Sequence, residues 1–114
     1  MIKSILLAVF FTLPVFLFAH SPSSINLKYE KENDKEILKI DISHSVRNVE
    51  RHYIESITIK VNGDEVEVLE YSKQKTESDH NVTVEMPGLQ KGDVVEVEAN
   101  CSRIGSRSAE LKIE

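Results

Sequence analysis

Apolar and polar residues alternate along most of this chain, and the alternation predicts β-strands rather than helices. No segment keeps apolar residues at the roughly 3.6-residue spacing of an amphipathic helix. A repeat of two is clear in Leu38, Ile40 and Ile42, and again in Val95 and Val97, and such residues share one face of a strand. We predict strands at 25–31, 36–43, 53–61, 65–71, 81–86, 93–101 and 109–113.

Turn residues separate the predicted strands. The Asn62-Gly63 pair favours a type I′ hairpin, because both central residues of that turn need a positive φ. Segments 32–35 and 87–93 carry similar turn signals, whereas segment 72–80 is polar, lacks alternation and is predicted to be a mobile loop. About seven short strands in one small domain predict an all-β fold, an immunoglobulin-like antiparallel β-sandwich.

The first 19 residues differ in composition from the rest. Lys3 precedes an apolar run over 5–18, which ends at Ala19, and this is the arrangement of a secretory signal peptide. We expect cleavage after Ala19, leaving 20–114 as a single domain that is secreted or periplasmic. The apolar run is shorter than the roughly 20 residues that span a bilayer, so we expect no stable membrane anchor.

Composition after residue 19 supports a β fold and limits the partners. All four Phe residues lie before residue 19 and the chain has no Trp, so the core is built from Val, Ile and Leu, as is typical of strands. The net charge is −5, from 14 basic and 19 acidic residues. Nucleic acids and anionic membrane surfaces are therefore not expected as partners.

Cys101 is the single cysteine and closes a predicted strand. In an exported protein a lone thiol forms no disulfide within the chain, so it is buried, bound to a metal or paired with another molecule. His20 stands at the expected mature N-terminus, His44 directly after a predicted strand, and His52 shortly before the next one. Imidazoles and a thiolate make a transition-metal donor set. The alternative is that Cys101 packs as a small apolar residue and the histidines are ordinary surface residues.

His80 is left out of this set. It lies between Asp79 and Asn81 at the start of a predicted strand, and we predict that its side chain is solvent-exposed.

The order of these motifs resembles the iron domain of superoxide reductases, the desulfoferrodoxin and neelaredoxin group. His-Ser-Pro at 20–22 resembles the first histidine motif of the family, His-x-Pro. His44 and the His-Tyr-Ile segment at 52–54 resemble its second and third histidines, and Cys-Ser-Arg-Ile-Gly at 101–105 is similar to its Cys-Asn-x-His-Gly segment. The resemblance runs from His20 to the last predicted strand.

The resemblance implies a seven-stranded sandwich that holds one iron between histidines, with an axial cysteine thiolate. It implies His20, His44, His52 and Cys101 as the ligands here. Ile104 stands where the family has its fourth histidine. Many members also have a Glu-Lys pair before the first histidine, whose lysine attracts superoxide, and this pair has no counterpart here. The implied reaction is the reduction of superoxide, or another small oxygen species, to peroxide with an external electron donor.

The sequence is compatible with three functions. The first is an exported mononuclear iron protein of the superoxide reductase type, in which the α-amino group of His20 can fill the vacated coordination position. The second is a non-catalytic metal-binding or electron-carrier protein on the same fold. The third is a metal-free binding module. Iron is preferred over copper, because a blue-copper site usually has a His and a Met soon after its cysteine and segment 102–108 contains neither.

Overall fold

The structure is a computed structural model that describes residues 21–114, and it confirms the predicted all-β, immunoglobulin-like antiparallel β-sandwich. The seven strands are β1 (Ser24–Glu32), β2 (Lys35–Ser43), β3 (Ile54–Val61), β4 (Asp64–Glu70), β5 (Asp79–Glu85), β6 (Val94–Cys101) and β7 (Ser106–Lys112). The predicted signal peptide and the proposed ligand His20 lie outside the described residues. No helix within 21–114 has the length and apolar character needed to cross a membrane.

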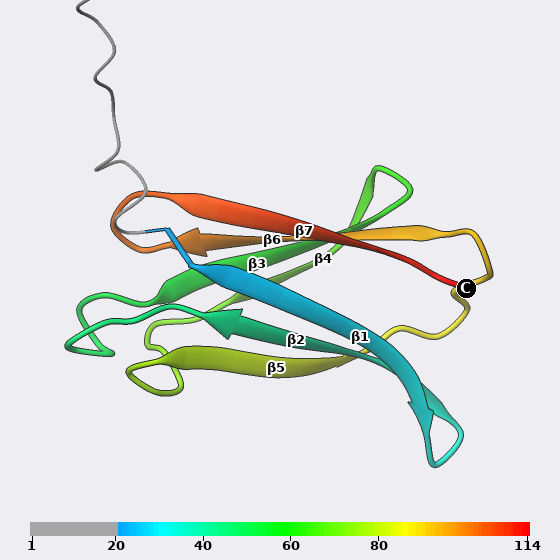
Figure 1. Ribbon diagram of the computed structural model, residues 1–114, viewed down its shortest axis with the longest axis horizontal. Helices are drawn as coiled ribbons and strands as arrows, with labels where there is room; N and C mark the ends of the chain where they lie inside the picture. The colour runs from blue at the N-terminus through cyan, green and yellow to red at the C-terminus, as the bar shows by residue number, and fades with distance from the viewer. Residues whose placement is uncertain (1–20) are drawn as a thin grey trace, which may run out of the picture.

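Two antiparallel sheets pack face to face (Figure 1). One has the strand order β1-β2-β5 and the other β4-β3-β6-β7. The inward residues come from the predicted alternation, and β2, β3 and β6 supply most of them. The fully buried apolar side chains of these strands are Leu38, Ile40, Ile42, Ile54, Ile57, Ile59, Val95, Val97 and Ala99. Each large aliphatic residue of this kind contributes about 1.5–3 kcal/mol through its burial.

The predicted hairpin turn between β3 and β4 is present. Asn62 has φ 51° and Gly63 φ 90°, as a type I′ turn requires. Asn33 and Asp34, between β1 and β2, take the same conformation with φ 51° and 66°. Asn and Asp tolerate this left-handed region better than most residues, which is why a turn forms there without glycine.

Two strands begin two or more residues earlier than predicted. β5 starts at Asp79, because Asp79 and His80 pair with Ser43 and Ile42 of β2. β7 starts at Ser106, which pairs with Asn100 of β6. Both extensions are polar, so they lack the hydrophobic alternation that marks a strand. Backbone pairing with a neighbouring strand holds them.

The prediction that His80 is solvent-exposed was wrong. Its side chain is 1% exposed, because β5 pairs with β2 and turns the imidazole inward against the ring of Tyr71. The two rings meet edge to face, with centroids 4.3 Å apart. Gln74, in the segment predicted to be a mobile loop, is equally buried.

One end of the sandwich collects the residues with the chemistry of a site. β2 and β6 end there and β3 begins there (Figure 1). His44 follows β2, His52 precedes β3, and Cys101 closes β6. The antiparallel pairing of β3 with β6 sets Ile54 opposite Cys101, which brings the His52 segment beside the thiol.

Candidate metal centre

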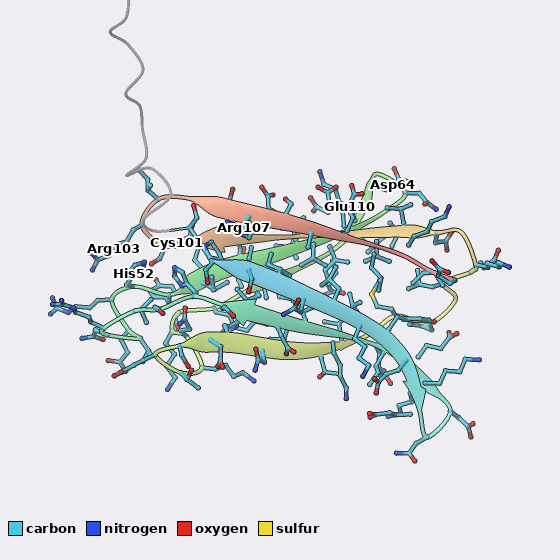
Figure 2. The ribbon with its side chains drawn as sticks, viewed as in Figure 1. His52, Asp64, Cys101, Arg103, Arg107 and Glu110 are labelled. Carbon is cyan, nitrogen blue, oxygen red and sulfur yellow. The ribbon has the colours of Figure 1, made fainter. Side chains whose placement is uncertain are left out.

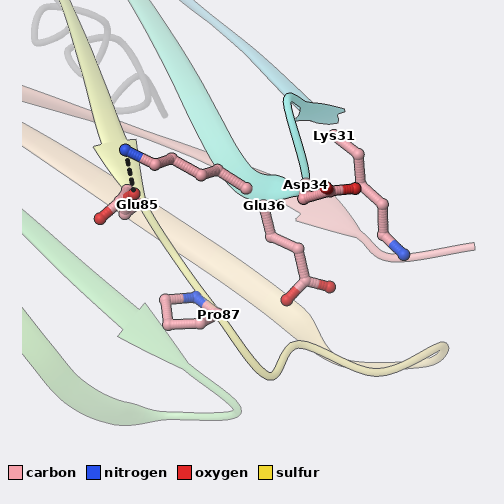
Figure 3. Close-up of a pocket in the computed structure, with 6 residues that line it drawn as sticks. Lys31, Asp34, Glu36, Glu85 and Pro87 are labelled. Carbon is pink, nitrogen blue, oxygen red and sulfur yellow. Dashed lines mark ion pairs between the residues drawn. The ribbon is translucent and has the colours of Figure 1, made fainter.

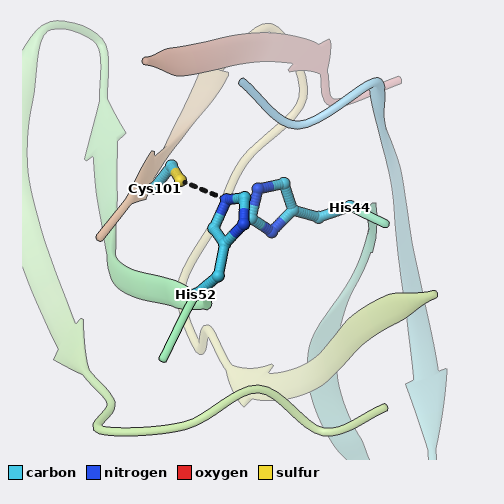
Figure 4. Close-up of side chains that lie close together, drawn as sticks. All are labelled: His44, His52 and Cys101. Carbon is cyan, nitrogen blue, oxygen red and sulfur yellow. Dashed lines mark hydrogen bonds between the residues drawn. The ribbon is translucent and has the colours of Figure 1, made fainter. Parts of the chain in front are cut away.

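Three donor residues converge at this end of the sandwich. One donor atom from each of His44, His52 and Cys101 lies within 4.8 Å of the other two. The Nε2 atom of His52 lies 3.1 Å from the sulfur of Cys101, and both point into the same space as His44 (Figure 4). The two imidazoles meet edge to face, with centroids 4.8 Å apart and planes at 86°.

Backbone hydrogen bonds hold the segments that carry His52 and Cys101 together. The N–H of Ser102 donates to the carbonyl oxygen of Tyr53 at 2.8 Å, and the N–H of Tyr53 donates to the Ser102 hydroxyl at 3.1 Å. The pairing register of β3 with β6 shifts between Ile54 and Ser56. Such a bulge re-aims side chains at a strand end. The ends of β3 and β6 therefore fix His52 against the thiol before any ion binds.

The sulfur of Cys101 is buried and held in place. Its residue is 5% exposed, and the N–H of Arg103 points at the sulfur at 3.4 Å. The chain then turns back sharply, with the Cys101 N–H donating to the carbonyl oxygen of Gly105 at 2.9 Å. Gly105 has φ 112°, and a Cβ there would collide with the hydroxyl of Ser21. Only glycine suits this turn, which closes directly behind the thiol.

His44 is held by a buried glutamine. The Nε2 amide of Gln74 donates to the carbonyl oxygens of His44 and Thr76 at 2.7 and 2.8 Å. Its Oε1 atom lies 2.7 Å from Nδ1 of His44. Because the glutamine nitrogen is committed to two acceptors, its oxygen faces Nδ1, and an amide oxygen only accepts.

This arrangement determines the tautomer of His44. The proton of the neutral imidazole sits on Nδ1, and the lone pair is on Nε2. A hydrogen bond to one ring nitrogen commonly orients a histidine that binds metal through the other. Gln74 therefore prepares Nε2 of His44 as a metal donor.

The donor set fits a transition metal. Ligand atoms that share one ion at about 2.0–2.3 Å lie roughly 3–4 Å apart, so the observed spacing needs only a small closure. A thiol and an imidazole 3.1 Å apart share a proton that a metal can replace, since metal binding to such groups releases protons. His44, His52 and Cys101 could thus hold a metal ion.

The structure brings together three of the four residues predicted from the sequence. The fourth, His20, is outside the described residues. Ile104, at the position of the missing histidine, is 52% exposed and adds no donor. Gln74 could not be identified from the sequence, because a lone glutamine in a polar segment gives no signal of burial.

This chain is similar to a known protein in fold but matches none in sequence. No protein-family profile and no curated protein matches this chain in sequence. The fold is similar to that of a superoxide reductase. That protein, the neelaredoxin from Ignicoccus hospitalis, is 19% identical to this chain with a TM-score of 0.52, and the match covers 89% of this chain and 88% of that one. The likeness is one of fold.

His80 lies outside the three-residue cluster and has a structural role. Its Nδ1 atom accepts a hydrogen bond from the N–H of Lys75 at 3.1 Å, so its proton is on Nε2, which is buried and has no hydrogen-bond partner among the described residues. Burial, followed by the nearby positive charge of Lys75, lowers the pKa of His80 to about 4. The side chain therefore stays neutral at physiological pH.

We expect His80 to make the protein less stable in mild acid. As pH falls from about 6.5 toward 4, the unfolded chain binds a proton at this residue that the folded chain does not, so the stability present above pH 6.5 is lost. The loss amounts to about 3 kcal/mol at most, for a pKa lowered from 6.5 to about 4. Urea unfolding of the metal-free protein at several pH values measures it.

The matched control for this experiment is His80→Asn. The Oδ1 atom of asparagine can accept the Lys75 N–H in place of Nδ1, and asparagine does not titrate. Between pH 6.5 and 4 the free energy of unfolding should fall much less in the variant than in the wild-type protein. An equal fall in both proteins would show that other groups cause the loss of stability.

Proposed function

We propose that this protein binds one iron ion through His44, His52 and Cys101 and reduces superoxide to hydrogen peroxide. The observation that carries the proposal is the convergence of two imidazoles and a buried thiol within 4.8 Å on a fold similar to that of a superoxide reductase. Imidazole and thiolate donors suit iron. Copper is the second choice, on the same donor set.

The chain's own residues would prepare the centre. Gln74 faces Nδ1 of His44 and so would present Nε2 as the donor atom for an ion. The paired ends of β3 and β6 hold Nε2 of His52 and the Cys101 sulfur 3.1 Å apart. Iron bound there would supply one electron, which with two protons converts superoxide into hydrogen peroxide, and an external donor would return the electron. As a thiolate, the buried sulfur would add negative charge beside such an ion and so favour its oxidation.

His20 is proposed as a fourth ligand. Ser21 packs against Gly105, in the turn that closes behind Cys101, and the carbonyl oxygen of Pro22 accepts a hydrogen bond from Nε of Arg107 at 2.7 Å. These contacts tie the residues that follow His20 to the loop beside the thiol. Both the imidazole and a mature α-amino group of His20 are potential donors, which supports this assignment.

We further propose that the protein is exported and matures by cleavage after Ala19. The apolar run after Lys3, which ends at Ala19, supports this. The free Cys101 is buried, which is compatible with an oxidising compartment. Mass spectrometry of the protein from the exported fraction should give a chain that begins at His20. A mature N-terminus elsewhere would remove the α-amino group of His20 from the site.

Superoxide reduction is tested directly on the iron-loaded, reduced protein. A pulse of superoxide should oxidise the iron within milliseconds and yield about one hydrogen peroxide per iron, followed by stopped-flow absorption and a peroxide assay. The reaction should disappear in His52→Ala, which loses a donor, and persist in His80→Asn. If reduced iron stays unchanged in superoxide while the protein still binds it, the enzyme function is wrong and metal binding or electron transfer takes its place.

A further inference from the structure

A second group of residues beside the candidate metal centre has a different chemistry. A hollow of about 480 Å³ opens next to His52 and is lined by three arginines, Arg47, Arg51 and Arg103. The first two lie on the segment between β2 and β3, and the third lies two residues after Cys101. Figure 2 shows Arg103 at the same end of the sandwich as His52 and Cys101.

The charge of this hollow is unbalanced. Its lining consists of the three arginines with Ser45, Val46, Asn48 and His52, and contains no Asp or Glu. The chain as a whole has a net charge of −5, so three cations around one hollow oppose the general trend. Guanidinium groups that line a hollow together, with no carboxylate in the lining, favour the binding of an anion.

A second hollow on the same protein provides the contrast. It lies at the turn between β1 and β2, has a volume of about 300 Å³, and is lined by Lys31 and Lys35 together with Asp34, Glu36 and Glu85. Lys35 pairs there with Glu85 at 3.5 Å (Figure 3). Its cations are already balanced by carboxylates. The hollow at the β1–β2 turn therefore differs from the arginine-lined hollow, which has no carboxylate in its lining.

The arginine segments are held by the fold. The N–H groups of Arg51 and His52 donate to the carbonyl oxygen of Asn48 at 3.1 and 3.0 Å, and Nε of Arg103 donates to the carbonyl oxygen of Arg51 at 3.4 Å. This last bond joins the two segments across the hollow. It uses only Nε of Arg103, so it does not occupy the two terminal NH₂ groups of the guanidinium.

We propose that Arg47, Arg51 and Arg103 form a binding site for a small oxyanion beside the metal centre. Oxyanions match the fork of N–H donors on a guanidinium. Because His52 lines both this hollow and the metal cluster, an anion bound here lies next to the centre. The site goes beyond the proposed function, since it depends on no metal and no redox reaction.

Inorganic phosphate is the probe, added to the metal-free protein at low ionic strength and followed by the amide shifts in NMR spectra. We expect saturable shifts confined to residues 45–52 and 102–104. Arg51→Gln and Arg103→Gln should each weaken binding about 10-fold or more, the usual loss for a hydrogen bond to a charged group. Raising the salt concentration from about 20 to 200 mM should weaken it further.

Two further variants make the result specific. Lys35→Gln removes one positive charge from the balanced hollow of Figure 3 and should leave phosphate binding unchanged. Arg47→Gln tests the site without touching the Arg103–Arg51 hydrogen bond, in case Arg103→Gln disturbs the loop. Shifts that do not saturate, that spread over the lysines, or that Lys35→Gln reduces as much as the arginine variants would overturn the proposal. So would binding of an acidic peptide without binding of phosphate.

Discussion

Replacement of Cys101 by serine should abolish metal binding with almost no change of fold. Serine differs from cysteine by one atom and fits the same buried position, but its hydroxyl does not ionise near neutral pH and is a poor ligand for a soft site. Loss of a residue that only supports a ligand costs about 10- to 100-fold in metal affinity, and loss of the thiolate itself should cost more. The thiolate-to-metal absorption band should vanish.

Metal content after dialysis and the visible spectrum measure this result, and circular dichroism checks the fold. His80→Asn is the control, because it changes a buried imidazole outside the cluster of His44, His52 and Cys101. It should retain both the metal and the band. Equal metal content in Cys101→Ser and the wild-type protein would show that the sulfur is not a ligand.

Replacement of Gln74 by leucine should weaken metal binding although this residue is not a ligand. Leucine removes the acceptor of the His44 Nδ1 proton, so the imidazole is no longer held in the tautomer that presents Nε2. Metal affinity should fall about 10- to 100-fold. The carbonyl oxygens of His44 and Thr76 lose their donor, so the free energy of unfolding should fall by about 1–3 kcal/mol.

Competition with a chelator measures the affinity, and NMR spectra of the imidazole nitrogens in the metal-free protein report the tautomer. The wild-type protein should show His44 protonated at Nδ1, and the variant should show a mixture. Gln90→Leu makes the same chemical change at an exposed position and should alter neither property. A variant that loses stability but keeps both the metal affinity and the tautomer would restrict Gln74 to a structural role.

The alternation of apolar residues was enough to predict the fold. Over 38–42 in β2 and 95–99 in β6 every second residue is buried and apolar, and Ile57 and Ile59 repeat this in β3. This period of two has one physical meaning, a strand with one face in the core. The hairpin at Asn62-Gly63 was equally local, because few residues accept positive φ. Strand ends held only by backbone pairing, such as Asp79 and Ser106, carried no such signal.

The candidate ligands could be named from the sequence, because few residue types bind transition metals and their order along the chain resembles a known family. The sequence does not show whether these residues lie close together in the fold. His52 and Cys101 are 49 residues apart in the chain, and only the pairing of β3 with β6 brings them to 3.1 Å. The sequence could not give this distance, since a register shift of one residue would turn the thiol to the other face.

The sequence by itself determined the strands, the turns and the chemical types available for a site, because these follow from local conformational preference and side-chain chemistry. Tertiary structure alone decided the burial of Gln74 and His80, the tautomer of His44, and the meeting of Arg51 with Arg103 across one hollow. These features depend on contacts between segments far apart in the chain. A polar residue carries no local mark of whether folding will bury it, and so the surroundings of the donors could be read only from the assembled sandwich.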